Sequence, residues 1–195
     1  TSLNGSRLSQ KYLGPSDHQP LVTRIEFYGP KTLAVMSFNV LYPQGVSYMT
    51  GKFDGGIPSW WEGLETQAGL ENVPAMQPEN QDLREKIIFE TIGEFLQALD
   101  DAICFLQECW PGLYDRLKKE FHTLQFFYTP SKNGRYGNLT ITKLQKFDSL
   151  SMEYSTNTDL ILQVFTMGTR AVFANLHGSF KGALNYNALM LGLPP

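Results

Sequence analysis

Charged residues are scarce in this chain, and the shortage excludes several classes of protein. Charged side chains make up 18% of the 195 residues, below the roughly one quarter of an average globular domain, which argues against a disordered chain or a coiled coil. The formal net charge is −3, so no global positive field attracts nucleic acid, although a local basic patch could still bind it. The composition therefore favours a packed globular protein.

Long apolar runs are missing as well. No stretch approaches the roughly 18 consecutive apolar residues that a transmembrane helix needs. The first ten residues lack the basic start and the apolar core of a secretory signal peptide. We therefore expect an intracellular protein, and a length of 195 residues predicts a single domain with one core.

Cysteine is represented only by Cys104 and Cys109. No other cysteine or histidine lies near them at the spacing of a metal site. We predict two reduced thiols of a non-secreted protein.

Two segments near the start of the chain predict an antiparallel hairpin. Residues 21–28 alternate between two faces, as in a strand with one wetter side. Residues 33–41 (LAVMSFNVL) are apolar almost throughout, as in a strand covered on both faces. The Gly-Pro pair at 29–30 is a turn signal. A two-residue turn there would place Pro20 opposite Asn39.

The rest of the chain alternates between strand and helix patterns. Residues 42–80 are rich in Gly, Pro, Asn and Gln, which predicts a long loop insertion. Residues 83–99 have helical spacing, with Arg84 among the polar residues off the apolar stripe. The same patterns predict a helix near 112–121 and strands near 102–107, 124–129, 139–142, 160–166 and 170–176. This order predicts an α/β (α+β) layered sandwich.

Four short motifs stand at the ends of the expected strands. Taken singly, each has an ordinary structural explanation, such as a turn, a satisfied core amide or a solvated charge, so only their combination points to chemistry. In chain order they are Pro15-Ser16-Asp17-His18, Ser37-Phe38-Asn39-Val40, Leu106-Gln107-Glu108 and Asn175-Leu176-His177.

In combination these motifs resemble the endonuclease/exonuclease/phosphatase superfamily, which has a DNase I-like fold. The first strand of the superfamily ends in T/S-F/W-N-V/I, matched by residues 37–40, and a later strand ends in L-Q-E, matched by residues 106–108. Residues 137–143 match its G-N/V-x-I-x-S/T-K segment, and residues 175–177 match its N-x-H. Its final strand opens with S-D-H-x-P-L/V, matched by residues 16–21.

Two features depart from the superfamily pattern. Its S-D-H segment closes the domain, whereas here it comes first, so in a single domain over 1–195, residues 1–28 correspond to the closing strand and residues 31–195 to the first half. The G-D-F/W-N segment between N-x-H and S-D-H is absent. A circularly permuted domain, an excerpt from tandem domains and a truncated domain all stay open. A permuted hairpin would keep His18 and Asn39 at one end of the same ladder.

The resemblance implies a catalytic and metal-binding set at these strand ends. Glu108 would bind Mg²⁺ or Mn²⁺, with Asn39 and Asp17 as further ligands or as residues that orient water. His18 would be the general base or a phosphate contact. His177 would donate a hydrogen bond to a phosphate oxygen.

The resemblance further implies a metal-dependent phosphoesterase, or a fragment of one, in which Asn175 helps to bind the substrate. Without the absent segment the chain alone is expected to be weak or inactive. Nucleic acid, a phosphoinositide and a sphingolipid are not distinguished as substrates. The alternative is a non-catalytic, degenerate domain that serves as a binding scaffold. Since residues 160–176 lack their usual neighbours, we also expect self-association, or a missing chain or partner over an open sheet edge.

Overall fold

The computed structural model describes residues 16, 18–26, 32–49, 74–144, 148–156, 158–167 and 171–177. The strands are β1 (Leu21–Glu26), β2 (Thr32–Asn39), β3 (Ala102–Cys109), β4 (Gln125–Pro130), β5 (Gly137–Thr142), β6 (Asp148–Thr156), β7 (Thr158–Met167) and β8 (Ala171–His177). The helices are α2 (Pro43–Met49), α3 (Gln81–Gln97) and α4 (Pro111–Glu120), with short 3-10 turns η3 (Pro74–Met76) and η4 (Pro78–Asn80). The expected α/β class is confirmed.

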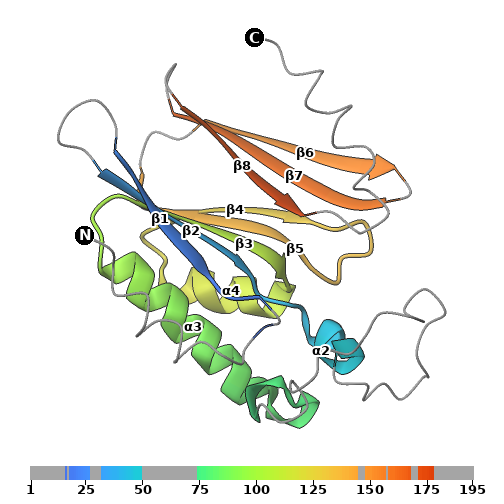
Figure 1. Ribbon diagram of the computed structural model, residues 1–195. Helices are drawn as coiled ribbons and strands as arrows, with labels where there is room; N and C mark the ends of the chain where they lie inside the picture. The colour runs from blue at the N-terminus through green and yellow to red at the C-terminus, as the bar shows by residue number, and fades with distance from the viewer. Residues whose placement is uncertain are drawn as a thin grey trace.

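These elements form three layers. A five-stranded sheet has the order β1-β2-β3-β5-β4, and a three-stranded sheet has the order β6-β7-β8. Within the first sheet β2 and β3 run parallel and the other neighbours run antiparallel. Helices α3 and α4 cover one face of the five-stranded sheet, and the three-stranded sheet covers the other (Figure 1).

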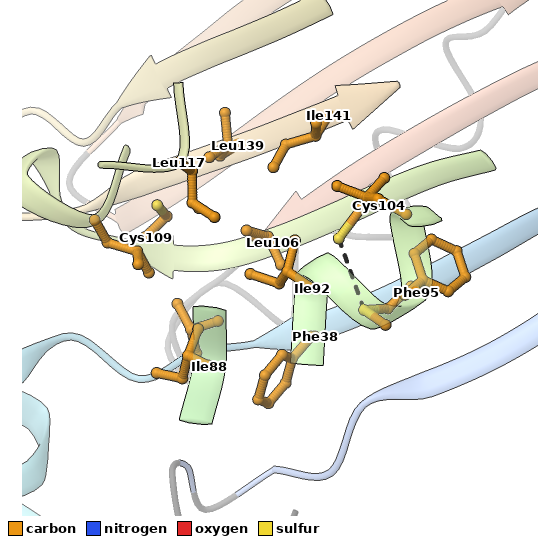
Figure 2. Close-up of a cluster of buried hydrophobic side chains, with 14 of the residues drawn as sticks. Phe38, Ile88, Ile92, Phe95, Cys104, Leu106, Cys109, Leu117, Leu139 and Ile141 are labelled. Atoms are coloured by element: carbon orange, nitrogen blue, oxygen red, sulfur yellow. Dashed lines mark hydrogen bonds between the residues drawn. The ribbon is translucent and has the colours of Figure 1, made fainter. Parts of the chain in front are cut away.

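Strand alternation explains the layer between the sheet and the helices. Even-numbered residues of β2 and β3, such as Phe38 and Leu106, share one face and pack against Ile88 and Ile92 of α3 (Figure 2). All four side chains are at most 1% exposed. This burial fixes α3 across the two parallel strands whose ends carry two of the motifs.

The odd-numbered residues face the second sheet. Leu33, Ile103 and Phe105 pack against Phe165 of β7, and the rings of Phe105 and Phe165 are 6.1 Å apart. Both faces of β2 and β3 are therefore covered, as the apolar sequence of residues 33–41 predicts.

The hairpin of β1 and β2 is confirmed, but its expected register is wrong. Leu21 pairs with Ser37 and Glu26 with Thr32, so the ladder is shifted by one residue and extends Pro20 toward Phe38 instead of Asn39. Residues 27–31, which include the Gly-Pro pair, lie outside the described part of the chain. The Gly-Pro signal predicted a hairpin but could not give its register.

Several local expectations are also corrected. The loop expected over 42–80 contains α2, η3 and η4, while residues 50–73 lie outside the described part. Strand β6 was not expected at all. Arg84, expected on the polar side of its helix, is 0% exposed.

Both cysteines carry free thiols, as the sequence predicts. Cys104 and Cys109 are both buried and free of any disulfide. Burial raises the pKa of both thiols, which suppresses the thiolate. No helix of the described chain is long and apolar enough to span a bilayer.

Candidate functional site

Three of the four sequence motifs meet where β2, β3 and β8 end. Asn39 is the last residue of β2, and its register partner in the parallel strand β3 is Gln107, next to Glu108. His177 is the last residue of β8 in the other sheet. Parallel strands finish at the same edge of a sheet, so the pairing of β2 with β3 alone brings Asn39 beside Glu108.

The carboxylate of Glu108 is the centre of the cluster. Its Oε1 accepts hydrogen bonds from Asn39 Nδ2 at 3.0 Å and His177 Nε2 at 3.1 Å, and its Oε2 accepts a long one from the Tyr42 backbone N–H at 3.4 Å. The side chains of Glu108 and His177 are 14% and 17% exposed. The expected meeting of Asn39, Glu108 and His177 is confirmed, whereas their chemical roles stay predictions.

The donors around Glu108 keep its carboxylate ionised. Burial raises the pKa of Glu108, but the hydrogen bond and charge of His177, with hydrogen bonds from Asn39 and the Tyr42 backbone, outweigh it and bring the pKa below its ordinary value. Hydrogen bonds to the charged form favour that form. The site therefore presents a fixed negative charge.

Uncommon backbone conformations aim these groups. Leu41 and Glu108 have φ of 52° and 56°, and among the described residues they are the only non-glycines with positive φ. The β3–β5 ladder shifts register between Leu106 and Cys109, which is how a bulge re-aims a side chain. Such conformations cost free energy and tend to cluster at functional sites.

The segment before β1 adjoins this edge. Ser16 Oγ donates to the carbonyl oxygen of Asn39 at 2.6 Å, and the His18 backbone N–H donates to Ser16 Oγ at 3.2 Å. His18 is exposed. The expected nearness of this segment to Asn39 is confirmed, and Asp17 lies outside the described residues.

Two tyrosines that no sequence motif indicated border the site. The Tyr136 ring meets the His177 ring edge-on at 5.8 Å, and Tyr42 lies 4.8 Å from Tyr136. Tyr42 lies two residues after the motif at 37–40, and Tyr136 directly precedes the segment 137–143. Their contacts join three separate parts of the chain. No local pattern could have revealed them.

Buried amides join the two sheets behind the site. Asn175 Oδ1 accepts from Gln107 Nε2 at 2.7 Å, and Asn175 Nδ2 donates to Gln163 Oε1 at 3.0 Å. Asn138 Nδ2 donates to the backbone carbonyl oxygens of Ile161 and Asn175, each at 3.1 Å. The network joins β3 and β5 to β7 and β8. It therefore fixes the position of His177 at the end of β8.

The substrate-binding role expected for Asn175 does not fit this arrangement. Its side chain is 1% exposed, and both of its polar atoms are engaged within the core. A residue so enclosed positions its neighbours and does not touch a substrate. The N-x-H pattern identified the right pair but could not tell which member faces outward.

A divalent cation fits Glu108 better than it fits Asn39. Mg²⁺ is commonly bound by one or two carboxylates and several waters, and Glu108 offers an ionised carboxylate whose Oε2 accepts only the long Tyr42 bond among the described residues. Asn39 turns its nitrogen toward Glu108, while its Oδ1 accepts the Leu41 N–H at 2.9 Å. The ligand role expected for Asn39 therefore does not fit, because its oxygen points elsewhere.

The described residues contain no group of three His, Cys, Asp or Glu side chains that could hold a metal ion. A scan against protein-family models, a search of curated proteins and a search of solved structures each found no match to this chain.

Proposed function

We propose that this chain carries the site of a metal-dependent phosphoesterase with a DNase I-like arrangement of strands. The observation that carries the proposal is the Glu108 carboxylate, held ionised by Asn39 and His177 at the junction of the two sheets. A mostly buried carboxylate whose pKa is shifted by specific donors, two on strands β2 and β8 and one in the segment after β2, is typical of a functional site. The S-D-H, L-Q-E and N-x-H motifs support the same function.

Glu108 would hold Mg²⁺ or Mn²⁺, which when bound supplies positive charge to a phosphate oxygen and lowers the pKa of a bound water. Asn39 keeps the carboxylate in one orientation through its Nδ2 bond. Its other end is fixed by the Leu41 N–H, so the amide cannot turn without losing both bonds. Orientation of this kind by outer partners tunes a metal ligand.

The histidines would handle protons and phosphate oxygens. His177 Nε2 must carry the hydrogen in its bond to Glu108, because a carboxylate only accepts. To donate to a phosphate oxygen, this N–H would have to exchange its Glu108 acceptor for the substrate. His18 is exposed, and its backbone is linked through Ser16 to the Asn39 carbonyl. From there its side chain would exchange a proton with a water or leaving group.

Turnover of a generic phosphodiester and phosphomonoester by the full product of the gene tests the proposal. Activity should require Mg²⁺ or Mn²⁺ and vanish with EDTA. Glu108→Gln keeps the shape and removes the charge, so activity should fall by orders of magnitude. His18→Ala should lose roughly 10²–10⁴-fold through lost proton transfer.

Glu90→Gln is the matched control, since Glu90 is an exposed carboxylate on α3 paired only loosely with Lys86 at 4.0 Å. It should behave as wild type. EDTA-resistant turnover, or a Glu108→Gln protein as fast as Glu90→Gln, would contradict the metal assignment. A folded wild type without turnover on either substrate would favour the binding scaffold.

A further inference from the structure

Arg84 is a charged side chain in the wrong place for an ordinary helix residue. It lies in the first turn of α3 and is 0% exposed. Long basic side chains normally bring their charge to water, and a fully buried arginine is rare unless it is paired. Its position therefore needs an explanation beyond helix formation.

The guanidinium spans from α3 to the end of β2. Its Nη2 donates to the carbonyl oxygen of Val40, and its Nη1 donates to Gln81 Oε1 at 3.1 Å. Its central carbon lies 5.0 Å from the centre of the Trp110 ring, within the range of a cation–π contact. Arg84 thus contacts the two segments that directly follow β2 and β3.

Val40 opens the short segment that encloses Glu108. The next residue, Leu41, has the positive φ of 52° and donates its N–H to Asn39 Oδ1. Tyr42 then donates its N–H to Glu108 Oε2. A left-handed conformation is unfavourable for leucine. This turn is therefore stable only if contacts with the surrounding residues stabilise it.

Stability alone does not account for a buried guanidinium. Taking a charge out of water is costly, and an apolar side chain of similar volume often stabilises a core as well or better. Unlike such a side chain, the planar fork of arginine can grip a carbonyl in a fixed direction.

We propose that Arg84 is a positioning residue for Glu108. By holding the Val40 carbonyl it keeps residues 40–42 in the conformation that turns the Tyr42 N–H and the Asn39 amide onto the carboxylate. This effect of Arg84 on residues 40–42 does not depend on any activity, and only its consequence for turnover rests on the proposed phosphoesterase function.

Amide hydrogen exchange tests the positioning without any activity assay. In Arg84→Met the amides of Leu41 and Tyr42 should exchange about ten- to a hundred-fold faster, the factor expected when a charge-assisted hydrogen bond is lost. The buried Ile141 amide in β5 reports global unfolding and should not change. Arg84→Lys keeps the charge without the fork and should show the same local acceleration.

Arg116→Met is the matched control, because Arg116 also lies over an aromatic ring, at 5.1 Å from Phe89, but is half-exposed. Its Leu41 and Tyr42 amides should exchange as in wild type. Unchanged exchange at Leu41 and Tyr42 in folded Arg84→Met and Arg84→Lys would overturn the proposal. Equal acceleration of all amides in both variants would also overturn it, since Arg84 would then be a general stability residue.

Turnover separates this inference from the function on which its consequence rests. If wild type is active, both Arg84 variants should lower kcat about tenfold or more with little change in KM, because a misaimed carboxylate weakens the chemical step more than binding. If wild type is inactive while the local exchange still accelerates, the proposed function fails and the positioning role stands. Full activity in both variants would contradict the positioning role.

Discussion

Glu108 is the residue on which the proposed function depends. It combines a left-handed backbone, a mostly buried side chain and donors from three parts of the chain. Two of those donors, Asn39 and His177, are named by the sequence motifs, while the Tyr42 N–H is not. The motifs therefore indicate the two side-chain donors, whereas the backbone donor is revealed only by the structure.

The lowered pKa of Glu108 predicts a pH-dependent contribution to stability. Because the pKa is lower in the folded state, the contribution is present above the ordinary glutamate value of about 4.3 and is lost as pH falls through the lowered pKa. Denaturant unfolding at neutral pH should show wild type more stable than Glu108→Gln by on the order of 1 kcal/mol. The difference should shrink toward zero in acid.

Glu90→Gln again serves as the control for this titration. Glu90 is exposed on α3, so its removal should change the free energy of unfolding little at any pH. A Glu108→Gln difference that stays constant from neutral pH into acid would show that the carboxylate is not held ionised.

At the scale of elements, the periodicity of apolar residues predicted the main strands and the long helix. Apolar runs predicted β2 and β3 and helical spacing predicted α3, because burial on a face imposes a period. The hairpin register differs by one residue from the expected one, because the Gly-Pro pair alone does not determine which residues of the two strands face each other. The polarity of Arg84 predicted an exposed side chain, which is wrong. No local pattern indicates that the Val40 carbonyl after β2 accepts its hydrogen bond.

The buried amide network was the largest omission, because its partners come from different sheets. Gln107 and Asn138 lie in motif segments and Gln163 does not, but nothing in the sequence indicates that the three amides face one another and not water. Only the stacking of the two sheets brings them together, at positions that are at most 8% exposed. Their mutual satisfaction is a tertiary property.

Asn175→Leu tests the network as an element that holds the sheets in register. The leucine fills a similar volume but leaves Gln107 Nε2 without its 2.7 Å acceptor. A buried unsatisfied polar group costs about 1–3 kcal/mol, and thermal and denaturant unfolding should show a loss of this size. Gln97→Leu on the exposed end of α3 is the control and should change stability little.

If the amides merely fill space, Asn175→Leu should be as stable as wild type or more so. That outcome would contradict a role for the network in holding the two sheets together. A stable variant with lost turnover would show that Asn175 positions His177 without contributing to stability.

At the scale of the whole molecule, both sheets have edge strands. In the described residues β1 pairs only with β2, and β8 pairs only with β7. Leu21 on β1 is 72% exposed. Exposed edges with apolar side chains invite pairing with another chain.

We therefore predict that residues 1–195 alone self-associate beyond the chain mass of 22.0 kDa. Light scattering over a range of concentrations measures this directly. Leu21→Lys should reduce association if β1 is the edge involved, because lysine on an edge strand opposes pairing. A stable monomer at all concentrations would contradict the prediction.

The assignment of Glu108 as a metal ligand is tested by Mn²⁺ binding followed by electron paramagnetic resonance, on wild type, Glu108→Gln and Glu90→Gln. If Glu108 holds the ion, wild type and Glu90→Gln should bind Mn²⁺ alike, and Mg²⁺ should compete. Glu108→Gln should bind at least about 100-fold more weakly, because loss of the ligand itself should cost no less than the 10–100-fold loss from its outer-shell partners. Equal Mn²⁺ affinity in wild type and Glu108→Gln would contradict the assignment.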